Sequence, residues 1–159
     1  MPVPKPARKD DSPESQLDGF LDKYTPAIAA LARACLDRMR ARLPGAVQLV
    51  YDNYNALAIG FGPSERAGEA IFSIALYPRW VTLFFLDGAG LPDPKHLLKG
   101  SGKVVRHIVL ASATDLDLPA IQRLMAEALR RADPGIDPAA SGSLVIRSIS
   151  AKQRPRRPA

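Results

Sequence analysis

The sequence is poor in the residues that most often build metal centres and covalent catalysts. It contains one cysteine and two histidines among 159 residues. A single cysteine excludes a disulfide framework within the chain and a zinc site built from paired cysteines. His96 and His107 have no third ligand at metal spacing, so we expect neither a bound metal nor a cofactor.

Long apolar runs are lacking as well. No stretch approaches the roughly 18 residues that a membrane span requires. The first residues combine prolines with charges instead of the apolar segment of a secretory signal. We therefore expect a cytoplasmic protein without a membrane partner, and the length is that of one domain.

Helical signals occur near both ends of residues 12–133, which we expect to form the single folded domain. The dipeptides Ser12-Pro13 and Thr25-Pro26 are each typical of a helix start. Apolar residues then recur every three or four positions over 26–43, which predicts an amphipathic helix. The segment 118–131 repeats this pattern, with Asp117 as its expected cap.

The middle of the chain changes to strand signals. In 57–62, large apolar residues alternate with alanine and glycine, which predicts a strand with one bulky face and one bare face. The segments 70–77 and 80–86 are apolar on both faces and belong at the centre of a sheet, and 104–110 is a further strand. This order predicts an α+β fold, a small antiparallel sheet with helices packed on one face.

Both chain ends are expected to be disordered arms. Residues 1–11 are rich in proline and charge, and residues 134–159 form a linker and a basic tail in which 143–150 is either a short edge strand or an ordered extension. The net charge is +6, yet 17–146 holds 14 basic and 13 acidic residues. We therefore interpret the globule as nearly neutral, with a loose tail that makes weak contact with polyanions such as nucleic acid.

The bare strand face is the candidate binding site, because small side chains let a ligand approach the backbone. Polar, aromatic and basic groups stand close to it in the sequence, although Asn and Asp also favour such junctions for backbone reasons alone. The candidate ligand-binding residues are Tyr51, Asn53, Asn55, Arg79, Trp80, Lys103 and Arg106. The ligand is a small molecule or a protein that the sequence does not identify.

The segment Lys99-Gly100-Ser101-Gly102-Lys103 resembles a phosphate loop, but the Walker pattern would need glycine at Leu97 and a hydroxyl at Val104. Two interpretations remain. The segment is a glycine turn that leads into a strand, or its backbone N–H groups and flanking cations form a modest anion site.

Catalysis is not favoured. Cys35 falls within the apolar stripe of 26–43, which predicts a buried structural thiol and not a nucleophile. No nucleophile and base stand together, so we name no catalytic residue. An enzyme would require that the fold bring a carboxylate to Lys103 or His107.

Several segments in series carry a family likeness. Asn55-Ala56-Leu57, Ala70-Ile71-Phe72-Ser73, the stretch 77–85, Gly100-Ser101-Gly102-Lys103 and Arg106-His107-Ile108 together resemble the YdhG-like domains, a bacterial family of unknown function. The likeness covers roughly residues 20–132. It implies a compact α+β fold with helices on an antiparallel sheet.

One branch of that family looks like frataxin, an iron-delivering protein that supports iron–sulfur cluster assembly. Frataxins bind iron through an acidic ridge on the first helix, whereas the comparable segment 26–43 carries one acid, Asp37, and four arginines. Three functions therefore remain open: a non-catalytic binding module, which we favour, a frataxin-like iron carrier, and nucleic-acid association through the basic tail.

Overall fold

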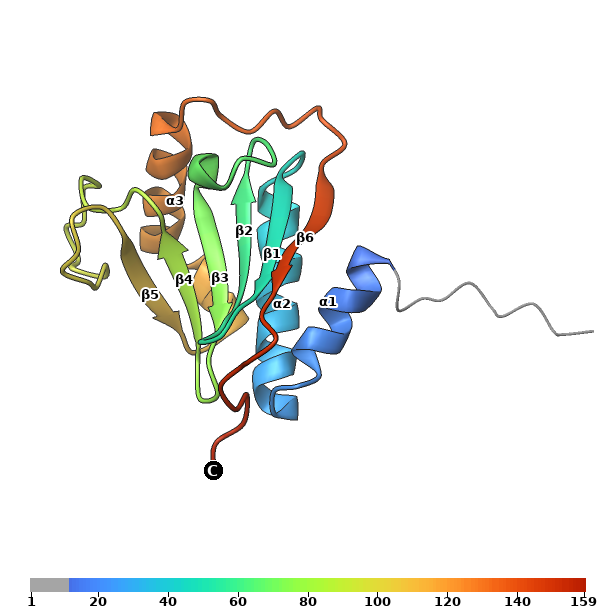
Figure 1. The fold of residues 1–159 in the computed structure, drawn as a ribbon. Coiled ribbons are helices and arrows are strands. Elements are labelled where there is room, and N and C mark those ends of the chain that lie inside the picture. Colours follow the sequence, from blue (N-terminus) through green and yellow to red (C-terminus); the bar gives the residue numbers. More distant parts are fainter. Residues whose placement is uncertain (1–11) are drawn as a thin grey trace, which may run out of the picture.

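The structure, a computed structural model, describes residues 12–159, and the arm expected over 1–11 lies outside these residues. Figure 1 shows the arrangement of the elements. In chain order they are α1 (Pro13–Leu21), α2 (Pro26–Arg42), β1 (Val47–Asp52), β2 (Leu57–Gly62), the short 3-10 helix η2 (Ala67–Glu69), β3 (Phe72–Leu76), β4 (Val81–Phe85), β5 (Arg106–Leu110), the 3-10 helix η3 (Ala113–Asp117), α3 (Pro119–Arg131) and β6 (Ser143–Ile149).

The first two helices begin where the sequence predicts. The Ser12 hydroxyl accepts a hydrogen bond from the Ser15 N–H at 3.1 Å, and the Thr25 hydroxyl accepts one from the Ile28 N–H at 3.4 Å. Each cap satisfies a backbone donor that has no partner within its helix. The expectation that Asp117 caps α3 is wrong, because Asp117 ends η3 and its carboxylate binds arginines of α2.

The sheet has six strands in the order β5-β4-β3-β2-β1-β6. β1 to β5 pair antiparallel with one another, as expected, and β3 and β4 lie centrally. The expectation of a purely antiparallel sheet is wrong, since β6 pairs parallel with β1. After α3 the chain crosses the upper end of the sheet and descends beside β1 (Figure 1), and this crossover gives β6 the same direction as β1.

The expected disorder of the C-terminal arm is also wrong. Beyond β6, the Ser150 N–H donates to the Asp52 carbonyl at 2.9 Å, and the Arg154 N–H donates to the Tyr54 carbonyl at 2.9 Å. The Arg156 side chain is buried and pairs with the buried Asp52 carboxylate at 2.9 Å. A basic, proline-rich composition favours a tail that does not pack on the fold. Here the buried carboxylate of Asp52 requires a counterion, and because Arg156 provides it, the tail is held in place.

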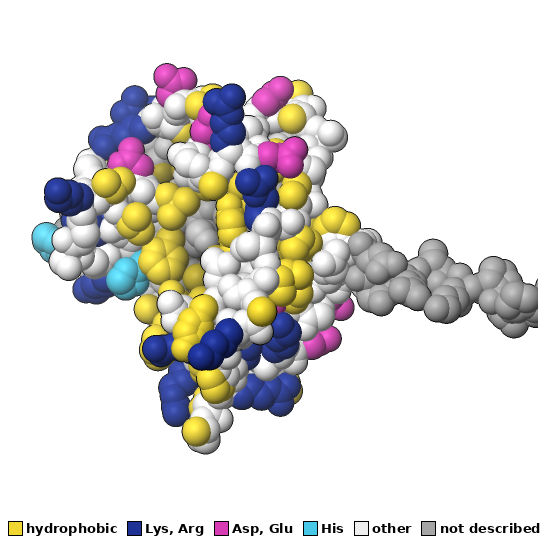
Figure 2. Space-filling view, in the orientation of Figure 1, with side chains coloured by type: hydrophobic (Ala, Val, Ile, Leu, Met, Phe, Trp, Pro, Cys, Tyr) yellow, Lys and Arg dark blue, Asp and Glu magenta, His cyan; other side chains and the backbone are white. Residues whose placement is uncertain are grey.

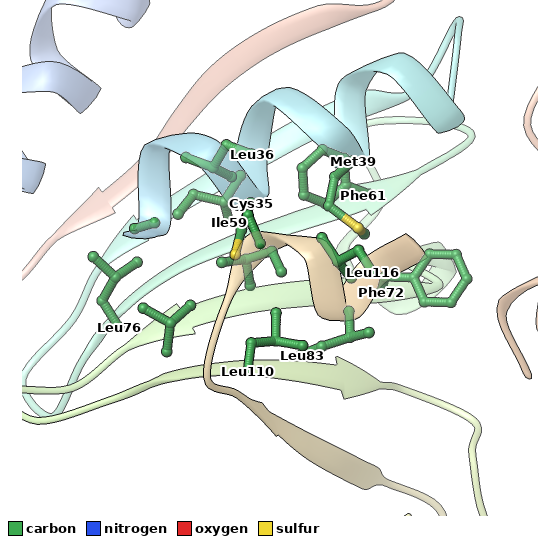
Figure 3. Packing of buried hydrophobic residues seen from close by; sticks show 14 of the residues in the cluster. Cys35, Leu36, Met39, Ile59, Phe61, Phe72, Leu76, Leu83, Leu110 and Leu116 are labelled. Atoms are coloured by element: carbon green, nitrogen blue, oxygen red, sulfur yellow. The ribbon is translucent and has the colours of Figure 1, made fainter. Parts of the chain in front are cut away.

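α2 and α3 lie on one face of the sheet, where the hydrophobic core forms, and α1 packs beside α2 at the β6 edge (Figure 1). Figure 3 shows Cys35 and Met39 of α2 among side chains of the strands, such as Ile59 and Leu83. Cys35 is fully buried, and this burial raises the pKa of its thiol to about 11. The prediction of a structural cysteine is confirmed.

The ordered tail changes how the charge is distributed. Residues 12–159 hold 19 basic and 14 acidic side chains, a net charge of +5. The interpretation of a nearly neutral globule with a loose basic tail is therefore wrong, because the folded part itself carries the excess.

Candidate binding face of the sheet

None of the three α-helices described in 12–159 covers the second face of the sheet, which points toward the viewer in Figures 1 and 2. We call it the open face. Strand register and side-chain alternation define its residues. They include Leu49 and Tyr51 on β1, Ala58 and Gly60 on β2, Ser73 and Ala75 on β3, Thr82 and Phe84 on β4, and His107 and Val109 on β5. At the upper end of the open face, Glu69 and Ala70, where η2 ends, lie over Gly60 and Gly62.

The open face is hollowed at its centre. Ala58 pairs with Ala75 and Gly60 pairs with Ser73, so β2 and β3 present only small side chains side by side. A shallow groove of about 450 Å³ lies over Ala58, Ser73 and Ala75, whereas Ala70 covers Gly60. Its other lining residues are Asn53, Tyr54, Asn55, Ala56, Tyr77, Phe84, Leu86 and Ser150. The bare face predicted for β2 thus continues onto β3.

The ten Phe, Tyr and Trp residues divide equally between the two sides of the sheet. Five are buried in the core beneath the helices: Phe20, Tyr24, Phe61, Phe72 and Phe85. The other five lie on the open face or at its lower end: Tyr51, Tyr54, Tyr77, Trp80 and Phe84. The Phe84 ring also lies against His107, with ring centres 5.6 Å apart. The open face is therefore rich in aromatic rings.

Three segments meet at the lower end of the open face in Figure 1: the β1–β2 turn 53–56, the β3–β4 turn 77–80 and the tail 150–157. We call this end the lower rim. The Tyr77 and Trp80 rings lie 5.7 Å apart at a tilt of 35°, and Trp80 is 47% exposed. The Arg154 guanidinium lies 5.6 Å from the centre of the Tyr54 ring. The lower rim thus combines exposed rings with cations.

An ion cluster fixes the tail at this rim. The Asp52 carboxylate accepts hydrogen bonds from Lys23 Nζ at 2.7 Å and from Arg156 at 2.9 Å. Burial alone would raise the pKa of Asp52, but these hydrogen bonds outweigh burial and hold the pKa below its ordinary value. Asp52 is therefore ionised at neutral pH and ties the tail to β1 and to the connection between α1 and α2.

The structure brings together five of the seven residues predicted for the ligand site. Tyr51 lies on the open face, Asn53 and Asn55 lie in the groove lining, and Arg79 and Trp80 lie in the β3–β4 turn of the lower rim. Asn53 is held by a hydrogen bond from the Ser148 hydroxyl at 2.9 Å.

Lys103 and Arg106 lie elsewhere, beside the start of β5 at the opposite end of the sheet. Arg106 pairs in register with the core residue Phe85, and its guanidinium donates to the carbonyls of Gly102 and Val105. Gly100 adopts a φ of +117°, and the chain turns there into β5. The geometry agrees with a glycine turn on the way into a strand, and the anion site at 99–103 stays a prediction.

The aromatic and basic groove or rim residues absent from the predicted set are Tyr54, Tyr77, Phe84 and Arg154. Tyr77 and Phe84 belong to segments that are apolar on both faces, a pattern that favours the sheet centre but does not show whether both faces are covered. Side chains two residues apart on a strand share a face, so Tyr77 lies on the same face as Ser73 and Ala75. This alternation is the signal from which the position of the Tyr77 ring could be predicted. Arg154 carried no such signal, because its position depends on the anchored tail.

Metal ligands are sparse in the described part of the chain. Residues 12–159 contain no group of three or more His, Cys, Asp or Glu side chains that could hold a metal ion. The acids Asp18 and Asp22 near the first helices both bind Arg33, at 2.7 and 2.8 Å. No observation on these residues favours the iron-carrier alternative. No helix described in 12–159 is long and apolar enough to cross a membrane.

Comparisons with known proteins add no relative: no family model matches the sequence, and neither a curated protein nor a solved structure matches it. The observations that bear on function are therefore the geometry of the open face and the resemblance in the sequence.

Proposed function

We propose that the chain is a YdhG-like domain that acts as a non-catalytic binding module, with its ligand over the open face. One observation carries this proposal. A groove with a floor of small side chains is lined by Tyr54, Tyr77 and Phe84, and Tyr51 and Trp80 lie on the same face of the sheet or at its lower rim, away from the core. Apolar side chains gathered on one surface are typical of interaction sites.

The groove lining supports binding more than catalysis. It offers phenol, amide and hydroxyl groups, from Tyr77, Asn53, Asn55 and Ser150, together with apolar surface. Such a mixture of apolar walls and a few polar groups is typical of ligand sites. None of the lining residues, all within 12–159, is Asp, Glu, His, Cys or Lys, so the groove holds no pair suited to general acid–base work.

A groove-filling variant tests this proposal. We would record amide chemical shifts of the protein while adding a library of aromatic and heteroaromatic fragments. Binding should shift the amides of 53–58 and 73–77. Ser73→Leu, which places a bulky group on the groove floor, should abolish those shifts, whereas Ala30→Leu on the exposed side of α2 should preserve them.

Two outcomes would contradict the proposal. A second cavity, of about 260 Å³, lies between 92–97 and α3. Fragment-induced shifts confined to that cavity would place the binding site beside α3 and not on the open face. Shifts at the groove that persist unchanged in Ser73→Leu would show that the groove floor does not contact the ligand.

A further inference from the structure

We propose that the open face binds single-stranded nucleic acid, with bases stacked on its aromatic rings and phosphates held at the lower rim. This inference depends on the proposed function, because it names the ligand class of the open face. It departs from association through a loose tail, since the tail is part of the fold.

The first argument is the placement of uncompensated positive charge. Nine of the 19 basic side chains in 12–159 pair with an acid, and the pairs lie mainly on the helical side, as with Arg38 and Arg42 on Asp117. The other ten pair with no acid in this range: Arg79, Lys95, Lys99, Lys103, Arg106, Arg123, Arg147, Lys152, Arg154 and Arg157. Nine of these ten lie on strands, turns or the tail and not on the helices.

The lower rim concentrates this unpaired charge. Arg79, Lys152, Arg154 and Arg157 all belong to its turn or its tail. The rim segments themselves contain no acid, and the neighbouring Asp52 at the end of β1 is buried and already neutralised by two cations. Figure 2 shows Lys and Arg at this lower end and acidic side chains mostly at the upper end. The field at the rim therefore favours an anionic ligand.

The second argument is the position of the rings relative to that charge. Trp80 and Tyr77 stand together at the rim, Tyr54 lies beside Arg154, and Phe84 lies further along the groove. Proteins that bind single strands combine a basic path for the backbone with aromatic side chains on which successive bases stack. The open face presents both parts on one continuous surface.

The third argument is shape. The groove floor is free of bulky groups because Ala58, Ser73 and Ala75 carry small side chains, so a planar base can lie over it between Tyr77 and Phe84. A duplex keeps its bases stacked inside and exposes only groove edges and phosphates, which rings on an open sheet cannot stack against. The geometry therefore favours a single strand over a duplex.

The intrinsic fluorescence of Trp80, the one tryptophan in the sequence, provides the assay. The full chain is titrated with unlabelled oligouridine and oligothymidine of about 12 nucleotides, a length within common site sizes, and with a mixed-sequence duplex. Titrations at several salt concentrations give the slope of log affinity against log salt. We expect both single strands to quench Trp80 and the duplex to bind much more weakly. Tighter binding of the RNA than the DNA would indicate a contact with the 2′-hydroxyl.

Matched variants separate stacking from charge. Tyr77→Leu should weaken binding by roughly 5- to 100-fold with little change in the salt slope, because it removes one stacking ring. Arg79→Ala should reduce the slope by about 0.7, the value for one phosphate contact on a single strand. Arg123→Ala removes the same charge from α3 on the helical side and should leave affinity and slope unchanged.

The inference is overturned if neither oligonucleotide binds, if the duplex binds as tightly as the single strands, or if Arg123→Ala costs as much as Arg79→Ala. It is also overturned if the double variant Lys99→Ala/Lys103→Ala abolishes binding while Tyr77→Leu does not, because the site would then lie beside β5. If oligonucleotides fail but the fragments still shift the groove amides, only the ligand class is wrong and the binding module remains.

Discussion

Replacing Arg156 with methionine tests whether the tail is an integral part of the fold. Arg156 is 6% exposed, and its guanidinium donates to the Asp52 carboxylate at 2.9 Å and to the Asn53 carbonyl. Methionine keeps an apolar stem over the Tyr24 ring, which lies 5.8 Å from the guanidinium carbon. Arg156→Met therefore removes the charge and its hydrogen bonds while retaining much of the packing.

The expected loss follows from the surroundings of Asp52. Breaking a buried ion pair by removing one partner costs about 3–5 kcal/mol, because the other charge stays buried. Here Lys23 remains at 2.7 Å. In addition, Arg156 Nε is the one buried side-chain N or O atom in 12–159 without a hydrogen-bond partner, so its removal relieves a small penalty. We expect a loss of about 2–4 kcal/mol, which corresponds to a fall in Tm of roughly 5–15 °C for a domain of this size.

Equilibrium unfolding in urea, followed by circular dichroism, measures this loss. Lys152→Met is the matched control, since Lys152 is an exposed cation of the same tail, and it should change stability by no more than about 0.5 kcal/mol. Hydrogen exchange gives an independent readout, because the Ser150 and Arg154 amides bond to Asp52 and Tyr54. Both amides should lose protection in Arg156→Met. Equal stabilities of the two variants, with both amides still protected, would refute the argument.

Three further predictions concern buried polar groups. Asp52→Asn should destabilise the protein at neutral pH. Because the pKa of Asp52 lies below its ordinary 3.8 in the folded state, the stability difference from the natural sequence should persist above that pH and shrink as pH falls through the folded-state pKa; a difference independent of pH between 7 and 2 would contradict this. Tyr24→Phe should cost about 1–3 kcal/mol in urea unfolding, since its hydroxyl donates to the Leu76 carbonyl and accepts from the Leu57 N–H, and an unchanged midpoint would count against those bonds. Cys35 should not react with a thiol reagent in the native protein and should react fully after unfolding, because burial raises its pKa to about 11; rapid native labelling would be inconsistent with its place in the core.

The sequence predicts those elements whose signal is local. The caps at Ser12 and Thr25 determine where α1 and α2 begin, and the alternation over 57–62 predicts both β2 and its bare face. The sequence does not predict β1 as a strand, because a polar cluster occupies 51–55 and Asp is rare in strands. In the fold, Asp52 is tolerated at the end of β1 because two cations from distant segments neutralise it.

The tail and the sixth strand depend on contacts that are far apart in the sequence. Ser143–Ile149 has modest strand character, and its partner β1 lies roughly a hundred residues earlier, so no local pattern shows the pairing. The same limit affects the candidate site. Local composition predicts Asn53 and Trp80 as site residues, and both lie near the open face. Lys103 lies at the other end of the sheet, and its position depends on the strand order, which no local pattern shows.

The parallel pairing of β1 with β6 has a consequence for synthesis and folding. β1 is translated early, yet its outer neighbour β6 and Arg156, one of the two counterions of Asp52, are translated roughly a hundred residues later. Until those residues leave the ribosome, β1 presents unpaired backbone groups along its outer edge, and such an edge invites pairing with other chains. Closing so large a loop is also slow compared with forming local hairpins. The nascent protein therefore remains prone to self-association until residues 143–156 emerge, and a variant that lacks these residues would remain in that state.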